Sequence, residues 1–298
     1  MALTTKNLPK VAIIMASYNG DRFIAEQIQS ILNQQDVTLD LYISDNNSQD
    51  KTQQIISEFK RSNPNIYTFV NRETTGAANN FYYLFKKINL KKYDFIALAD
   101  QDDIWPGHKI SRAIAQLINH QCQGYASDFL YFHENQNFKY YKKSYVQTKF
   151  DYLFETPGPG CTFVLTSSLS ALFKDFLISQ KINFPFHDWL IYAFARSQNF
   201  KWLIDDSPNL FYRQHDRNEA GVNNGFYAVI RRLNRILLGR WWSQIYALTQ
   251  ILQIDDFKKW SQRQVFLYLL RHFFTTRRNR LHALFMVPFL FLIGMQKK

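Results

Sequence analysis

The sequence predicts an α/β fold in which a mostly parallel sheet is flanked by helices. Short runs of consecutive apolar residues alternate with stretches in which apolar residues recur at helical spacing. Residues 11–16 form the first apolar run, and helical spacing follows in residues 23–32. Continuous apolar runs are typical of strands buried on both faces. Their alternation with helices predicts parallel strands joined by right-handed crossovers.

The same alternation predicts the remaining elements in order. A polar, Tyr- and Lys-rich connection is expected at residues 138–150, and a sharp turn at Pro157–Gly160. Further strands are expected at residues 39–44, 65–70, 93–99, 124–133 and 161–165, and helices around residues 55–59 and at 77–88, 168–179 and 187–195.

Three polar loops leave the predicted strands, at residues 17–20, 45–50 and 100–103. Parallel strands end at the same edge of a sheet, and open α/β sheets bind their ligands outside those carboxyl ends. We therefore expect the three loops to form one site.

The last of these loops holds three carboxylates within four residues, Asp100, Asp102 and Asp103. Such neighbours repel one another, so the cluster is stable chiefly when a divalent cation or a set of donors neutralises it. Oxygen ligands suit Mg²⁺ or Mn²⁺, and these ions most often hold phosphates. The alternative is a solvated acidic turn or a helix N-cap before Pro106.

Composition places the chain among folded proteins of a reducing compartment. Hydrophobic residues make up 46% and aromatic residues 17%, which argues against disorder. The two cysteines, Cys122 and Cys161, lack the spacing of a zinc ribbon or a disulfide framework. Residues 11–16 are too short for the apolar core of a signal peptide. We expect a cytosolic chain without a secretory signal.

The net charge of +12 is concentrated at one end of the chain. Residues 225–298 hold 13 Lys and Arg against 2 Asp and Glu, whereas residues 1–224 hold 23 against 22. This difference predicts a nearly neutral body, residues 1–224, followed by a basic, aromatic and helical tail, residues 225–298.

The tail interleaves Arg, Trp and Phe in a pattern typical of a helix that lies in a membrane interface. Its most apolar stretch, residues 281–295, is shorter than the ~20 residues needed to span a bilayer. We expect an in-plane or re-entrant anchor on an anionic membrane surface. A helical cap that completes the catalytic domain is the alternative, and the same apolar surface could serve a homodimer.

Six segments, taken together and in order, resemble family 2 glycosyltransferases, and the match covers residues 10 to about 221. The form DQDDIW at residues 100–105 is similar to the branch that contains bacterial rhamnosyltransferases. The segments are Ala16–Asn19, Ser44–Asp50, Asp100–Asp103, Gly158–Cys161, His187–Trp189 and Tyr212–His215.

The resemblance implies a GT-A fold with a Rossmann-like sheet. Its nucleotide-sugar half would be about residues 1–105, and its acceptor half about 106–224. Asp45 would accept the N3–H of a uracil or thymine ring, and Asp100 would bind the ribose hydroxyls. The nucleotide contacts would be completed by Ser17, Tyr18, Asn19 and Asn47. For Asp45, a local turn or helix cap is the alternative.

The resemblance also implies a metal and a diphosphate site. Asp102 and His215 would bind Mn²⁺ or Mg²⁺, which stabilises charge on the departing nucleoside diphosphate. Asp103 would contact the acceptor or orient its neighbours. Arg213 and Arg217 would pair with the diphosphate.

Asp188 is the residue expected to act as general base in an inverting transfer. Family members usually carry an acidic pair here, and this chain has His187 in place of the first acid, so acceptor recognition would differ. Asp188 could equally serve the N-terminus of the following helix. Gly158 and Gly160 would allow close approach of a sugar, and Trp105 and Trp189 would form walls or belong to the core.

These features predict transfer from a UDP- or dTDP-sugar, with rhamnose suggested by the motif form, to a saccharide or lipid-linked saccharide in surface polysaccharide synthesis. The enzyme would attach peripherally to the inner face of the cell membrane. Two other classes compete. A nucleic-acid-binding protein would explain the basic tail but not the acidic loop, which would repel phosphate backbones. A non-catalytic membrane scaffold would not need the five residues Asp45, Asp100, Asp102, Asp188 and His215.

Overall fold

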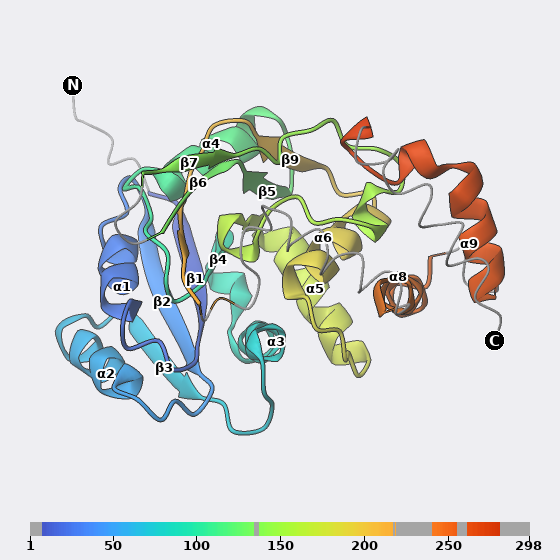
Figure 1. Cartoon of the computed structure of the whole chain (residues 1–298). Coiled ribbons are helices and arrows are strands. Elements are labelled where there is room, and N and C mark those ends of the chain that lie inside the picture. Colours follow the sequence, from blue (N-terminus) through green and yellow to red (C-terminus); the bar gives the residue numbers. More distant parts are fainter. Residues whose placement is uncertain (1–7, 134–136, 217, 219–239, 255–260, 281–298) are drawn as a thin grey trace.

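The computed structural model describes residues 8–133, 137–216, 218, 240–254 and 261–280. A seven-stranded sheet runs through the centre of the molecule in the order β3-β2-β1-β4-β8-β5-β9 (Figure 1). Its strands are β1 (Lys10–Ser17), β2 (Thr38–Asp45), β3 (Ile66–Val70), β4 (Phe95–Ala99), β8 (Val164–Thr166), β5 (Gly124–Ser127) and β9 (Trp202–Asp205).

The first four strands confirm the predicted parallel order. β1 pairs in parallel with both β2 and β4, and β2 pairs in parallel with β3. The sheet becomes mixed at β8, which is antiparallel to both β4 and β5. Because both neighbours of β8 run opposite to it, β5 has the same direction as β4, and the carboxyl end of β5 lies at the same edge as that of β1.

One predicted strand is wrong in its extent. Residues 124–133 divide at Asp128 into β5 and β6 (Phe129–His133), and β6 belongs to a second sheet. The buried Asp128 carboxylate accepts hydrogen bonds from the backbone N–H groups of Lys143 and Ser144, which fixes the point where the chain leaves the first sheet. The second sheet has the order β10-β6-β7, with β7 at Lys139–Tyr141 and β10 at Phe211–Gln214.

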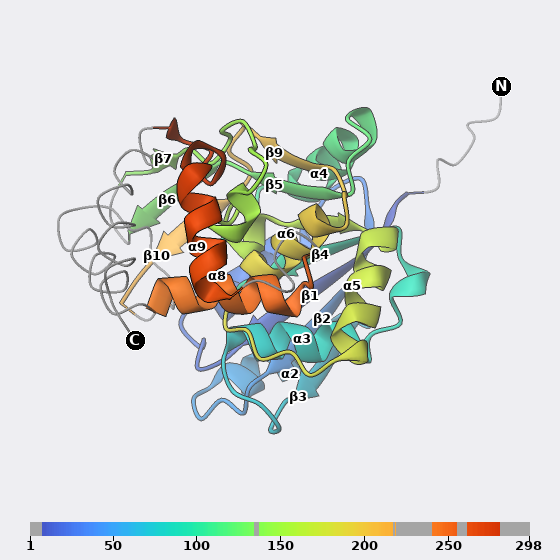
Figure 2. The same cartoon turned by 90° about the vertical axis from the view of Figure 1, so that its right-hand side faces the viewer.

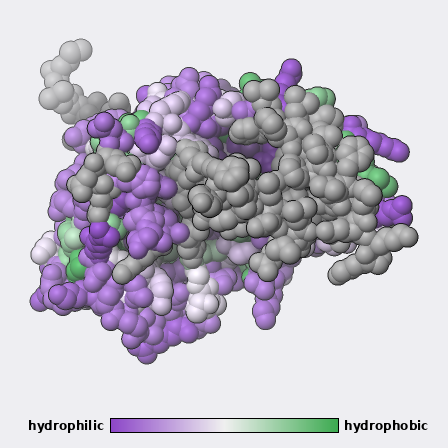
Figure 3. Space-filling model, viewed as in Figure 1, coloured by the Kyte–Doolittle hydropathy of each residue, from purple (hydrophilic) through white to green (hydrophobic). Residues whose placement is uncertain are grey.

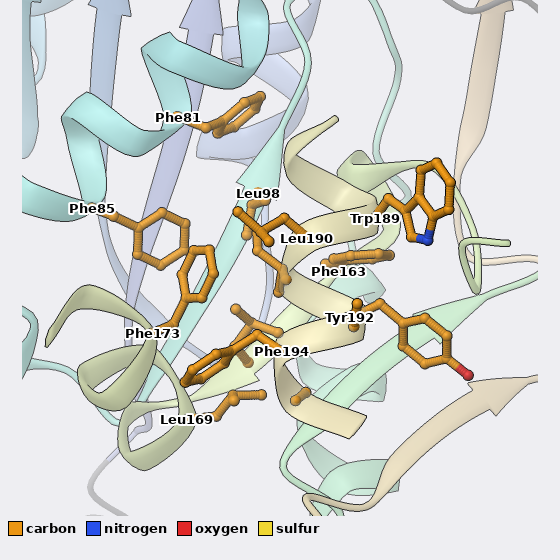
Figure 4. Packing of buried hydrophobic residues seen from close by; sticks show 14 of the residues in the cluster. Phe81, Phe85, Leu98, Phe163, Leu169, Phe173, Trp189, Leu190, Tyr192 and Phe194 are labelled. Atoms are coloured by element: carbon orange, nitrogen blue, oxygen red, sulfur yellow. The ribbon is translucent and has the colours of Figure 1, made fainter. Parts of the chain in front are cut away.

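Helices cover both faces of the main sheet. Both faces need cover because successive apolar side chains of β1 point to opposite faces. Val11, Ile13 and Met15 face one hydrophobic cluster, and Ala12 and Ile14 face the other. The first cluster is covered by α1 (Ile24–Leu32), α2 (Thr52–Ser62) and α4 (Lys109–Asn119); the second is covered by α3 (Ala77–Lys87), α5 (Ser167–Ser179) and α6 (His187–Ser197). Figure 4 shows aromatic side chains of α3, α5 and α6 converging in this second cluster.

Part of the predicted tail packs against the body formed by residues 1–224. Helix α8 (Arg240–Ile251) buries Ile245 and Leu248 in the second cluster, and α9 (Gln262–Arg271) lies beside α8 (Figure 2). A 3₁₀ turn (Phe273–Thr275) follows, and its Thr275 carbonyl accepts the Phe150 N–H at 2.9 Å. These contacts agree with the alternative of a cap that completes the domain. Residues 225–239, 255–260 and 281–298 of the tail lie outside the described residues.

Within the described residues, no helix combines the length and apolar character required to cross a bilayer. The described surface in Figure 3 is mainly hydrophilic, with scattered apolar positions.

Candidate active site

The ends of β1, β2 and β4 bring the three predicted polar loops to one edge of the sheet. Ser17 at the end of β1 pairs with Asp45 at the end of β2 in the parallel register, and its hydroxyl donates to the Asp45 carboxylate at 3.1 Å. Gln101, between the acidic residues, accepts the Tyr18 N–H at 2.9 Å and donates to the Tyr18 carbonyl at 3.0 Å. Gln101 was not singled out from the sequence, although it stands inside the acidic motif.

Asp45 is a buried carboxylate whose two oxygens each accept two hydrogen bonds. The donors are the hydroxyls of Ser17 and Ser48, the Ser48 N–H at 2.9 Å and the Gln53 amide at 2.8 Å. This arrangement orders the loop after β2, as the turn alternative requires. The Asp45 carboxylate also lies at the end of β2, at the edge where the predicted contact with a nucleobase would be made. That contact stays a prediction.

The loops after β1 and β2 use left-handed backbone conformations to bend at this edge. Asn19 has φ 45° and Asn47 has φ 58°, a region in which Asn is favoured over most non-glycine residues. The Asn19 N–H donates to Ser48 and its side-chain oxygen accepts the Gln49 N–H, both within 2.9 Å. Tyr18 remains 56% exposed beside them and is available to a ligand.

Asp102 and His215, which the family resemblance assigns to a metal, lie in direct contact, and their role toward a metal stays a prediction. The His215 Nε2 lies 2.8 Å from the Asp102 Oδ2, and Asn218 donates to the same oxygen at 3.4 Å. His215 follows β10, and its ring lies 4.9 Å from the Phe23 ring. A strand from the second sheet therefore delivers an imidazole to the acidic loop of the first.

Asp103 is fully buried, so its carboxylate does not face a ligand directly. It accepts the Arg213 N–H at 3.1 Å. Burial, followed by the neighbouring charges of Asp102 and Asp100, raises the pKa of Asp103 well above its usual range. Ligand atoms of Asp100, Asp103 and Cys161 lie within 4.8 Å of one another. This position favours the orienting role over the acceptor contact.

Arg213 holds the acidic loop in place rather than facing an open diphosphate site. Its Nε donates to the Asp102 carbonyl at 2.9 Å, and its Nη2 pairs with Glu26 on α1. The guanidinium lies 4.5 Å from the Phe23 ring centre and 4.8 Å from that of Phe132. Arg217, the second predicted diphosphate partner, lies outside the described residues.

Both tryptophans occupy core positions. Trp105 is 3% exposed and lies 3.9 Å beneath the ammonium of Lys109, another buried residue. Trp189 is buried and donates its indole N–H to the Tyr152 carbonyl at 2.8 Å. Both tryptophans therefore belong to the core, which was the alternative to a role as walls of the sugar site.

Asp188 is a partly buried carboxylate in the first turn of α6. It accepts the Trp189 N–H at 2.8 Å. Burial raises the pKa of the Asp188 carboxyl to about 6, although the Trp189 N–H and the Lys143 ammonium both lower it. A carboxylate with this proton affinity is ionised at neutral pH and still a competent proton acceptor.

His187 is packed between α3 and the glycine turn. Its ring stacks on Phe81 with 4.0 Å between ring centres, and a Cβ placed on Gly160 would lie 2.4 Å from its Nε2. Burial lowers the pKa of His187 to about 3, so the imidazole is neutral. His187 therefore sets the space available to the turn, and Gly160 is required because any side chain would collide with the ring.

Helix α3 connects the two halves of the site. Asn80 donates to the Ser44 carbonyl at 2.6 Å near the end of β2, while its neighbour Phe81 supports His187 beside Asp188. Gly158 lies against the end of β5, where a Cβ would come within 3.6 Å of the Ser127 carbonyl. The predicted nucleotide and acceptor segments thus occupy one continuous edge.

The residues present fit a divalent ion. The Asp102 carboxylate remains partly exposed and is paired with an imidazole, and further carboxylates stand close by. Burial is the main cause of the raised pKa of Asp103, and the negative charges of Asp102 and Asp100, which a cation would neutralise, add to it. Carboxylate oxygens with one imidazole are ligands that suit Mn²⁺.

The sequence profile of glycosyl transferase family 2 matches residues 12–178. The chain is also 39% identical over 250 residues to a dTDP-rhamnosyl transferase, RfbG, of Shigella flexneri, an alignment that covers 82% of this chain and 86% of that protein. The chain belongs to family 2, and it is a glycosyltransferase with the GT-A fold.

Solved structures support the fold. The TarS 1–349 fragment of S. aureus, in complex with UDP-GlcNAc, is similar with a TM-score of 0.56 at 16% identity, covering 96% of this chain and 89% of that one. A mannosyltransferase of Pyrobaculum calidifontis, in complex with GDP-Man and Mn²⁺, is similar with a TM-score of 0.55 at 13% identity, covering 97% and 84%.

Proposed function

We propose that this glycosyltransferase moves a rhamnosyl group from dTDP-rhamnose to a saccharide or lipid-linked saccharide acceptor in surface polysaccharide synthesis, with inversion at the anomeric carbon. The observation that carries the reaction type is the geometry of the sheet edge. Asp102 follows β4 at this edge, His215 contacts it from the end of β10 in the second sheet, and the partly buried carboxylate of Asp188 lies at the start of α6.

In the proposed reaction, Asp188 takes the proton of an acceptor hydroxyl as that oxygen attacks the anomeric carbon. The new glycosidic bond forms while the bond from that carbon to the diphosphate breaks, and the nucleoside diphosphate leaves. A divalent ion at Asp102 and His215 would neutralise charge on the leaving group. One base acting on the face opposite the leaving group gives inversion.

The choice of dTDP-rhamnose rests on the Shigella relative, which is a dTDP-rhamnosyl transferase. The family resemblance assigns Asp45 to the N3–H that thymine and uracil share, so UDP is the competing nucleotide. Four protein donors already occupy the Asp45 oxygens, so this contact would replace one of their hydrogen bonds. Tyr18 is exposed beside it and could pack against the base.

A thermal-shift screen with dTDP and UDP, each with and without Mn²⁺, tests the donor class. We expect a Mn²⁺-dependent rise in melting temperature with dTDP and a smaller one with UDP, because a ligand that binds only the folded state stabilises it. Transfer from dTDP-rhamnose to a panel of saccharide acceptors follows. No shift with either nucleotide would contradict the proposal.

We also propose that residues 225–298 bring the enzyme to the cytoplasmic leaflet. Support comes from the outer side of the described helices, where Arg263, Leu267, Arg271 and Phe274 are exposed. Cations and apolar side chains on one exposed surface favour anionic lipid. Sedimentation with phosphatidylglycerol vesicles, compared with phosphatidylcholine vesicles, tests this proposal.

A further inference from the structure

Gln101 joins the acidic loop to the loop that follows β1. It stands between Asp100 and Asp102, and its side-chain amide makes two hydrogen bonds to a single residue of the other loop. The Gln101 Oε1 accepts the Tyr18 N–H at 2.9 Å, and the Nε2 donates to the Tyr18 carbonyl at 3.0 Å. One side chain therefore pairs with both backbone polar groups of Tyr18, as a residue of a neighbouring strand would.

Gly20 leaves room for this amide. A Cβ placed on Gly20 would lie 2.2 Å from the Gln101 Oε1 and 3.0 Å from the Nε2. Among the described glycines, Gly76 is the one with a positive φ, so Gly20 supplies space here rather than a left-handed backbone. The Gln101 amide therefore lies directly against the loop at Gly20 as well as at Tyr18.

The next two residues of the same loop have anchors in the segment after β2. The Asn19 N–H donates to the Ser48 Oγ at 2.8 Å, and the Gly20 N–H donates to the Thr52 Oγ1 at 2.8 Å. Tyr18 precedes both anchors, and its backbone groups are bound by the acidic loop instead. The acidic loop therefore decides how the Tyr18 side chain is directed.

The Tyr18 ring lies where a ligand can reach it. It is 56% exposed, and it follows Ser17, which pairs in register with Asp45 at the end of β2. An aromatic ring stacks favourably only within a narrow range of orientations. If the backbone of the ring were loose, ligand binding would have to order it, and the affinity would fall by that cost. Holding the Tyr18 backbone therefore favours binding of a flat ligand.

We propose that Gln101 is a positioning residue for the nucleotide, which holds the Tyr18 ring where it packs against the base. This inference rests on the proposed function, because it takes the Tyr18 side of the edge as the nucleobase side. It also explains why an uncharged amide stands between two carboxylates. The hydrogen bond to the Tyr18 carbonyl needs an N–H donor, which an ionised carboxylate lacks.

The test measures binding of thymidine to the full-length protein in EDTA, by calorimetry. Thymidine carries the base without a phosphate, so the measurement does not involve a metal. We expect Gln101→Ala to bind thymidine roughly three- to tenfold more weakly than wild type, the range for a lost neutral hydrogen bond. Gln54→Ala, an exposed glutamine on α2, is the matched control and should bind as wild type does. Unchanged binding by Gln101→Ala, or an equal loss in Gln54→Ala, would overturn the proposal.

Gly20→Ala tests the same contact without altering Gln101. The new methyl group would displace the Gln101 amide, which is the far end of a flexible side chain, so the melting temperature should change little. We expect Gly20→Ala to weaken thymidine binding about as much as Gln101→Ala does. The two changes combined should cause no further loss, because one contact cannot be broken twice. Losses that simply add would contradict the inference.

A double-mutant cycle with Tyr18 separates positioning from a general structural role. In a Tyr18→Ala background, Gln101→Ala should have almost no further effect on thymidine affinity, because Gln101 acts through the Tyr18 ring. All four proteins are measured well below their melting temperatures, so that each is folded. An effect of equal size in both backgrounds would mean that Gln101 acts by another route, and the inference would be wrong.

The wild-type protein distinguishes this inference from the proposed function. If wild type binds neither thymidine nor dTDP with Mn²⁺, the proposed function fails and this inference fails with it. If wild type binds dTDP with Mn²⁺ but not thymidine, the base adds no measurable affinity, and only this inference is overturned. If wild type binds both and Gln101→Ala binds thymidine equally well, again only this inference fails.

Discussion

Asp188, the proposed general base, shows how surrounding groups change the proton affinity of one carboxyl. The start of α6 supplies a backbone N–H, Lys143 supplies positive charge, and burial outweighs both in raising the pKa of the carboxyl to about 6. We expect Asp188→Asn to lower the transfer rate by roughly 10²–10⁴-fold, the contribution of a general base. Binding of dTDP with Mn²⁺ should persist in calorimetry. Asp175→Asn, an exposed position on α5, is the control, and normal turnover by Asp188→Asn would refute the assignment.

The raised pKa of Asp188 also predicts a pH dependence of both activity and stability. Transfer should fall as the pH drops through about 6, because the base becomes protonated. The folded state holds this proton more tightly than the unfolded chain does, so ionising Asp188 costs stability, and the cost appears as the pH rises from 4 to 6. Asp188→Asn should therefore melt above wild type at pH 7.5, with the difference shrinking by pH 4. A constant difference would show that Asp188 titrates normally.

At the scale of elements, the glycine turn and α6 fit together through His187. Gly160→Ala would place a methyl group 2.4 Å from Nε2 of a ring that is stacked on Phe81. We expect a loss of about 1–3 kcal/mol in the free energy of unfolding, typical of overpacking. Removing the ring should relieve the clash, so the cost of Gly160→Ala should shrink in a His187→Ala background. Denaturant titration of the four proteins measures this, and strict additivity would contradict the contact.

Arg213 joins β10, α1 and the acidic loop. Lysine cannot reproduce the donor to the Asp102 carbonyl, the pair with Glu26 and the position between two aromatic rings at once. We expect Arg213→Lys to weaken Mn²⁺-dependent dTDP binding about tenfold, because the Asp102 carboxylate loses its fixed position. Binding of dTDP without metal should change little. Arg61→Lys, exposed on α2, is the control, and an equal loss with and without metal would argue against a positioning role.

The sequence predicts best what is local along the chain. The apolar run of β1 implied burial on both faces, and its alternate residues indeed enter two clusters. The meeting of Asp102 with His215 was predicted only through the family resemblance, because 113 residues separate the two. The break at Asp128 depends on hydrogen bonds between distant segments, and no periodicity in the sequence marks it.

At the scale of the whole molecule, the charge boundary at residue 224 does not coincide with a boundary in packing. Ile245, Leu248 and Leu252 lie in the same cluster as the buried face of β1, and Arg278 pairs with Glu155 just before the glycine turn. The C-terminal part therefore packs against the segment that leads into the glycine turn. Arg263, Leu267 and Arg271 on α9 are exposed, and binding of this surface to a membrane stays a proposal.

The packing of α8 predicts that the C-terminal part and the catalytic body unfold together. Leu248→Ala removes a fully buried side chain from the second cluster and should cost about 2–5 kcal/mol. Leu267→Ala, 45% exposed on α9, should cost far less and is the matched control. If the two parts form one cooperative unit, Leu248→Ala will speed hydrogen exchange in β1 and β4 as well as in α8, as measured by mass spectrometry on peptides from each. Faster exchange in α8 alone would instead mean that the helix is an appendage that detaches from an intact catalytic domain.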